Sequence, residues 1–158
     1  MSMFDKILVP TDGSELSAKA VEAAIQFCLR TGAQMLLLVV RSRTPIASPV
    51  GFSNELYDTP MTEDGVITPD EVRSRLQSQA EQALQRMVER VRAAGAKCEG
   101  VVVAGDQPYK AIIEVAEQQG VGMVMMASHG RSGLQALLLG SETQKVLTHS
   151  KVPVLVFR

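Results

Sequence analysis

The chain has 158 residues, of which 46% are hydrophobic and 21% are charged, with a formal net charge of −1. This balance fits one folded domain and excludes a disordered tail or the basic surface typical of nucleic-acid binders. No apolar run reaches the roughly 18 residues needed to cross a bilayer, and the N-terminus lacks a signal-peptide pattern, so we expect a cytoplasmic protein without a membrane span.

Short, continuous apolar runs alternate with amphipathic segments along the chain. Runs of this kind are typical of strands that are buried on both faces. We expect strands at Lys6–Val9, Met35–Val40, Gly100–Ala104, Met123–Ala127 and Val152–Phe157. We expect helices over about 14–31, 69–94 and 108–119, and a fourth from about Ser141.

Two of these helices begin with the spacing of a capping box, in which the side chains of two residues three apart satisfy the first backbone amides. Thr68 and Glu71 form one such pair, and Ser141 and Gln144 form another. Of the two cysteines, Cys28 falls on the apolar face of the first helix, which favours a reduced core thiol.

The alternation predicts a single α/β domain over residues 1–158, a doubly wound, Rossmann-like parallel sheet of five strands in the order 3-2-1-4-5 with four helices. Ligands of such sheets bind where the strand order reverses, here beside the first and fourth strands. Residues 41–68, rich in proline and glycine, form a long loop in this scheme. It is either a functional lid or a surface excursion.

Small and polar residues follow the two strands at the reversal point. Gly130 comes soon after the fourth strand, where we expect positive φ and close approach of a ligand to the backbone. Gly140 and Ser141 precede a helix whose first amides attract an anion. Arg131 adds a positive charge. Asp12, after the first strand, can contact a ligand or cap the first helix. The pattern predicts a phosphate-binding site.

The stretch from Ala127 to Val146 resembles the nucleotide motif of the universal stress protein family: Gly, two residues, Gly, nine residues, Gly, then Ser or Thr. Ala127, Gly130, Gly140 and Ser141 stand at these positions, so alanine replaces the first glycine. ILVPTDGSE near the start, LLLVV at Leu36–Val40 and KVPVLVF at Lys151–Phe157 resemble the family's first, second and last strands. The resemblance covers nearly the whole chain.

The resemblance implies ATP binding, with AMP or ADP as other possible nucleotides and with Mg²⁺ or Mn²⁺ bridging the phosphates. Pro10, Thr11 and Asp12 would line the adenosine, and Val39 would meet the adenine edge through its backbone. The phosphate side of the implied site comprises Ala127, His129, Gly130, Arg131, Ser132, Gly140, Ser141 and Glu142. For His129 itself, without an identified carboxylate partner, an incidental position is the favoured interpretation.

The leading hypothesis is an ATP-binding stress-response protein that acts through nucleotide-dependent conformation and contact with an unknown protein partner. No catalytic residue can be assigned, so we do not expect an enzyme, and slow ATP hydrolysis is the least favoured alternative. Another alternative, which Ala127 leaves open, is a nucleotide-free dimeric interaction module of the same fold. We expect a homodimer through Val152–Phe157, because Pro153 suits an edge strand. The resemblance implies the same, since universal stress proteins pair through their last strand.

Overall fold

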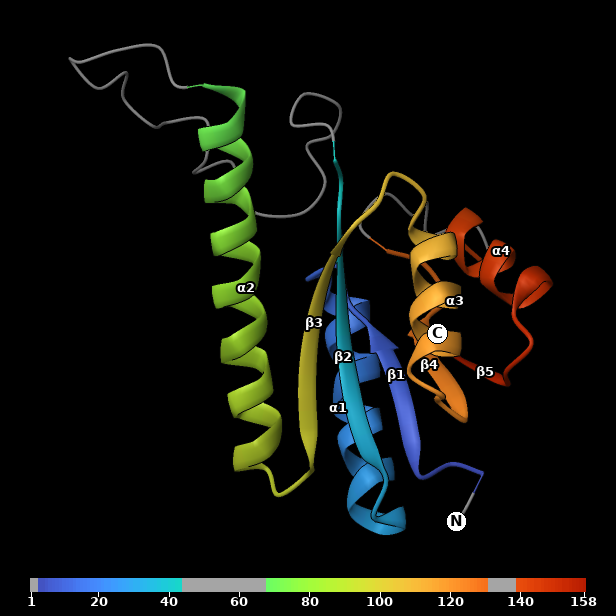
Figure 1. The fold of residues 1–158 in the computed structure, drawn as a ribbon. Helices are drawn as coiled ribbons and strands as arrows, with labels where there is room; N and C mark the ends of the chain where they lie inside the picture. Colours follow the sequence, from blue (N-terminus) through green and yellow to red (C-terminus); the bar gives the residue numbers. More distant parts are fainter. Residues whose placement is uncertain (1–2, 44–67, 131–138) are drawn as a thin grey trace.

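The computed structural model describes residues 3–43, 68–130 and 139–158. They form one five-stranded sheet in the order β3-β2-β1-β4-β5, with every pair of neighbours parallel (Figure 1). The strands are β1 (Lys6–Pro10), β2 (Gln34–Arg41), β3 (Cys98–Ala104), β4 (Met123–Ala127) and β5 (Val154–Phe157). The helices are α1 (Glu15–Thr31), α2 (Pro69–Ala93), α3 (Pro108–Gln118) and α4 (Ser141–His149). The expected fold and strand order are therefore confirmed.

Helices cover both faces of the sheet, so the core is split into two layers. Ile7 and Val9 of β1 face α1 and α2, whereas Leu8 faces α3 and α4, and all three side chains are fully buried. Successive side chains of a strand point to opposite faces, which is why this apolar strand supplies both layers. Because all neighbouring strands are parallel, their C-terminal ends lie at the same edge of the sheet.

The helix starts match the sequence expectation in one case and differ in another. Thr68 and Glu71 form the capping box of α2, with the side chain of each bonded to the backbone amide of the other. At α4 the expected box is absent: Gly140 is the N-cap, without a side-chain hydrogen bond, and Ser141 is the first helical residue. The expected capping box does not form because Ser141 lies one residue after the N-cap position.

The edge strands differ most from the sequence expectation. The last strand begins at Val154 rather than Val152, because Ser150 accepts from the Val152 amide and donates to its carbonyl in a local turn. β3 is only partly buried, with Glu99 and Gly100 exposed, because it has a neighbour on one side only. Of the long loop expected over residues 41–68, residues 44–67 lie outside the described part of the chain.

No helix in the described residues is long and apolar enough to span a bilayer.

Candidate functional site

The segment after β1 is fastened to the end of the neighbouring strand. The Thr11 amide donates to the Leu38 carbonyl of β2 at 2.9 Å. The Thr11 hydroxyl lies 3.2 Å from that of Ser17 in α1, and both side chains are buried. The turn is therefore held from both sides, which is the rigidity that a binding loop needs.

Asp12 sits at the tip of this turn. One carboxylate oxygen, Oδ1, accepts from the Ser14 amide at 2.9 Å, and Gly13 between them has a φ of 77°. The cap of α1 is Ser14, whose hydroxyl accepts from the Ser17 amide. Asp12 is thus not the helix cap that the sequence allowed. It shapes the turn instead.

Ala127 ends β4 in ordinary strand conformation. Among the described residues, no side-chain-bearing residue has positive φ, so the alanine that replaces the family's first glycine causes no backbone strain. Its carbonyl accepts from the Thr143 hydroxyl at 3.0 Å, a buried bond that attaches α4 to the end of β4. The alanine does not disturb the turn that follows.

Gly130 brings the two loops together, though not in the way the sequence suggested. Its φ is not positive, so that expectation was wrong. What demands glycine is space: a Cβ at this position would overlap Oδ2 of Asp12. The segments after β1 and β4 are therefore in contact at the point where the strand order reverses.

The start of α4 completes the site. The Gly140 amide donates to the Ser128 carbonyl at 2.7 Å, and a Cβ on Gly140 would lie 3.1 Å from Cα of His129. In the described part of the chain, the first-turn amides of Ser141, Glu142 and Thr143 receive no side-chain cap from the N-cap residue Gly140, and Ser141 is exposed. Uncapped amides at a helix N-terminus favour an anion through their N–H groups and the helix dipole.

The backbone of β2 corrects the expectation for Val39. The Met35 amide donates to the carbonyl of Lys97, the residue just before β3, and alternation then directs the backbone groups of Val39 into the β2–β3 ladder. Val40 directs its groups toward β1, which ends at Pro10, opposite Leu38. Among the described residues, the one with an open backbone edge beside the site is therefore Val40, one position further along.

Comparison with known proteins identifies the family to which a chain with this architecture belongs. The model of the family described as "Universal stress protein family" matches residues 3–158. The chain belongs to the universal stress protein family. It is 30% identical over 156 residues to universal stress protein MJ0577 of Methanocaldococcus jannaschii, covering 99% of this chain and 96% of that one. It is 31% identical to YxiE of Bacillus subtilis over 156 residues, covering 99% of this chain and 100% of that one.

Solved structures agree. That of MJ0577 superposes with a TM-score of 0.75 at 29% identity and covers 98% of this chain and 96% of its own. A universal stress protein crystallised in complex with cAMP has a TM-score of 0.67 at 23% identity, covering 99% and 98% of the two chains, and shows the shared fold.

His129 of this universal stress protein is held by its neighbour. Its Nδ1 lies 3.0 Å from the hydroxyl of Ser128, whose side chain is buried. With Glu15, Leu16, Lys19 and Arg158 it lines a hollow of about 340 Å³. The ring therefore lies on the α1 side of the loop.

Glu142 has protein partners at both carboxylate oxygens. Oε2 accepts from the Tyr109 amide at the start of α3 at 2.8 Å, and Oε1 lies 3.1 Å from Lys145 Nζ. The side chain thus caps α3, whose own N-cap residue, Gln107, does not cap the helix with its side chain. Nothing in the sequence spacing indicated this pairing, because the two residues are 33 positions apart.

Two of the expected site residues, Arg131 and Ser132, lie outside the described residues. Pro10, Thr11, Asp12, Ala127, Gly130, Gly140 and Ser141 gather at one edge of the sheet. In the described ranges, no three His, Cys, Asp or Glu side chains cluster in a way that could hold a metal ion.

Proposed function

We propose that this chain binds ATP, or a closely related adenine nucleotide, at the C-terminal ends of β1 and β4, and that protein partners read its occupancy in a stress response. The observation that carries the proposal is the meeting of three features at one point. Asp12 abuts Gly130, and the uncapped first turn of α4 begins beside them through the bond from Gly140 to Ser128.

The phosphates are assigned to the start of α4. Three first-turn amides, for which the N-cap Gly140 supplies no side-chain acceptor, can each donate to a phosphate oxygen, and the Ser141 hydroxyl adds a fourth donor. Arg131 would add positive charge, as the resemblance implies. A divalent cation, Mg²⁺ or Mn²⁺, would bridge phosphate oxygens, which suits a site that has no dense cluster of ligating side chains in its described part.

The adenosine is assigned to the β1–β2 side. The rigid turn at Thr11 and Asp12 would face the ribose, with the Asp12 carboxylate accepting from a sugar hydroxyl. The backbone of Val40 replaces that of Val39 as the group that meets the adenine edge. A carboxylate on the sugar and amides on the phosphates would orient the nucleotide across the reversal point.

The described residues offer no assigned general base beside the proposed phosphates, so binding rather than turnover is the proposed activity. A bound nucleotide would connect the β1 and β4 loops to α4, and a partner that contacts these segments would distinguish the two states. Support for an adenine nucleotide comes from the cAMP complex of a protein with the same fold and from Gly130, Gly140 and Ser141, which resemble the family's nucleotide motif.

Pairing of two copies through β5 is part of the proposal. β5 is an edge strand, and Leu155 on it is 38% exposed. Pro153, just before the strand, cannot donate to a ladder and is tolerated at such an edge. A nucleotide-free dimeric module remains the competing function, and it would use this same edge.

Calorimetric titration of the purified chain with ATP, with and without Mg²⁺, tests the proposal. Saturable binding, with a rise in melting temperature that grows with nucleotide concentration, is the expected result. Heats indistinguishable from dilution for ATP, ADP and AMP would favour the nucleotide-free module. Multiple-turnover release of phosphate would instead indicate an ATPase.

A further inference from the structure

The outer edge of β3 carries a short stretch of backbone that has no partner among residues 3–43, 68–130 and 139–158. The Met35 amide of β2 donates to the Lys97 carbonyl, and the Gly105 amide donates to the Arg41 carbonyl, both at 2.8 Å. Odd-numbered residues of β3 therefore face β2. By alternation, the N–H and C=O groups of Gly100 and Val102 point away from the sheet.

Arginine side chains donate hydrogen bonds to the backbone carbonyls on either side of this stretch. Arg92 Nε donates to the Cys98 carbonyl at 2.9 Å, and Arg43 Nε donates to the Ala104 carbonyl at 3.3 Å. Proteins commonly protect sheet edges with charged side chains in this way. The protection leaves a gap from Gly100 to Val102, long enough for a short strand.

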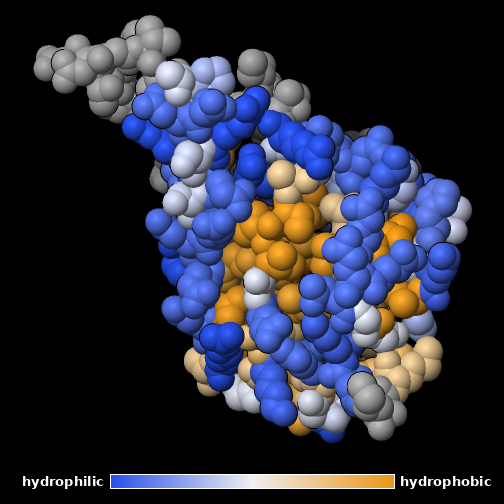
Figure 2. All heavy atoms as spheres, viewed as in Figure 1, coloured by the Kyte–Doolittle hydropathy of each residue, from blue (hydrophilic) through white to orange (hydrophobic). Residues whose placement is uncertain are grey.

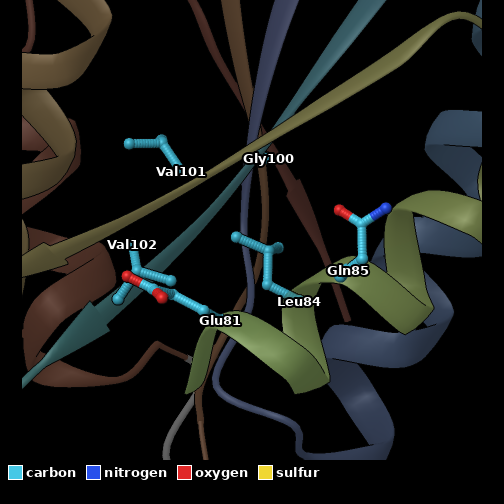
Figure 3. Close-up of a pocket in the computed structure, with 6 residues that line it drawn as sticks. All are labelled: Glu81, Leu84, Gln85, Gly100, Val101 and Val102. Carbon is cyan, nitrogen blue, oxygen red and sulfur yellow. The ribbon is translucent and has the colours of Figure 1, made fainter. Parts of the chain in front are cut away.

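A hollow of about 300 Å³ adjoins the gap, between β3 and α2 (Figure 3). Glu81, Leu84 and Gln85 point from α2 toward the strand, with Leu84 between the two polar side chains. A Cβ on residue 100 would lie 2.8 Å from Cγ of Leu84, so glycine is what allows α2 to approach this closely.

The rim of the hollow presents acceptors. Glu81 Oε1 accepts from Gln77 at 2.6 Å, whereas Oε2 has no partner in the described part of the chain. The Gln85 side-chain nitrogen donates to Glu89, and the Gln85 side-chain oxygen is left without a donor among the residues that the structure describes. One negative charge and a second acceptor thus border an apolar floor, which suits a long side chain with a cationic head.

The opposite face of the same edge is apolar. Val101 and Val103 are only partly buried against the core layer under α3. Figure 2 shows a hydrophobic patch with hydrophilic borders between α2 and α3, over β3. Patches framed in this way mark interaction surfaces.

We propose that the β3 edge binds an extended segment of a partner protein as an added strand, with a lysine or arginine over the α2 hollow and apolar residues directly before and after it. Backbone groups of the segment bond to Gly100 and Val102. Its apolar side chains cover Val101 and Val103, and its cation meets Glu81. A second copy of β3 would offer Cys98, Gly100, Val102 and Ala104 on the α2 side, none of them cationic, and would leave Glu81 without a counter-charge. The proposal does not depend on nucleotide binding.

Short synthetic peptides with blocked termini test directly whether the β3 edge binds an added strand. The probe is a fluorescently labelled peptide, Thr-Val-Lys-Val-Thr, and the control peptide is Thr-Val-Glu-Val-Thr with the same label. Each is titrated with the full chain, and binding is measured by fluorescence anisotropy. We expect the lysine peptide to bind about tenfold more tightly, and Glu81→Gln to remove most of that difference. Glu99→Gln, on the same strand but outside the hollow's lining, is the matched control and should leave the difference unchanged.

Amide hydrogen exchange locates the contact. In the free chain, Val101 and Val103 should be protected by β2 while Gly100 and Val102 exchange quickly. The lysine peptide should slow Gly100 and Val102 alone, and a peptide N-methylated at the lysine should fail to do so. Equal affinity of the two peptides, or unchanged exchange at Gly100 and Val102, would overturn the proposal. Protection there that rises with protein concentration would assign the edge to a second copy instead.

Discussion

Oδ2 of Asp12 occupies the space that a side chain on Gly130 would need. The contact joins the turn after β1 to the turn after β4, two segments more than a hundred residues apart in the chain. A ligand that contacts both loops therefore meets a preformed corner, the junction of Asp12 and Gly130. The shape of this corner depends on the absence of a Cβ atom at residue 130.

Gly130→Ala tests this corner. The added methyl group would displace the Asp12 carboxylate, so we expect ATP affinity to fall by about tenfold or more, since misplaced polar groups lose roughly 1–3 kcal/mol of interaction. Gly105→Ala is the matched control, because a Cβ there would make only ordinary contacts at 3.7 and 3.9 Å. Calorimetry on both variants measures the effect, and equal affinities would count against the assigned site.

Thr143→Val tests how α4 is attached. The change keeps the shape of the side chain but removes the donor to the Ala127 carbonyl, which is buried. Leaving a buried acceptor without a partner should destabilise the chain by about 1–3 kcal/mol. Urea unfolding measures this directly. An unchanged midpoint would mean that other contacts hold the helix start in place.

Glu142→Ala separates two roles for one side chain. The carboxylate caps α3 through the Tyr109 amide, so its loss should lower stability by about 1 kcal/mol, the usual effect of a lost helix cap. We expect nucleotide affinity to change much less. Glu142→Gln, which keeps one acceptor oxygen, should restore part of the stability. The reverse outcome, full stability with lost ATP binding, would make Glu142 a ligand contact.

The buried thiols predict an alkaline limit to stability. Burial raises the pKa of Cys28 and of Cys98 from 9.0 to about 11. Both groups hold their protons more tightly when folded, so this contribution is complete below pH 9 and is lost as the pH rises through about 11. Melting temperatures across this range should fall more steeply for the native chain than for Cys28→Ala/Cys98→Ala. Parallel curves would show that the thiols do not cause the decline.

Leu155→Asp tests the pairing of two copies through β5. A charge on this partly exposed edge residue should convert a dimer to a monomer without unfolding it. Light scattering after size exclusion measures the mass, and Leu29→Asp, at the exposed and more distant α1 surface, serves as control. A native chain that is monomeric at all concentrations would refute the pairing.

The sequence predicted most of the fold because its signals are local. Continuous apolar runs and capping residues such as Thr68 and Glu71 act within a few positions, and the structure confirms the strands and this capping box, although not the second box expected at Ser141. The strand order followed from the alternation of strands and helices, which restricts the connections a parallel sheet can make.

The site was harder to predict, since its details depend on which way individual backbone groups point. Val39 and Val40 cannot be distinguished by composition, yet alternation in β2 gives only one of them an open edge. The reason for glycine at 130 also lies outside its own segment, in the carboxylate of Asp12. Likewise, the capping of α3 by Glu142 joins residues whose proximity only the folded chain reveals.

Ser128 is bonded through its backbone in two directions: its amide donates to Phe157 of β5, and its carbonyl accepts from Gly140. One residue thus separates the edge where two copies would pair from the helix start proposed to bind phosphate. If pairing repositions β5, that displacement reaches the anion site through a single residue. Thermodynamic reciprocity then requires that any nucleotide which tightens self-association be held more firmly by the assembled form, by the same factor.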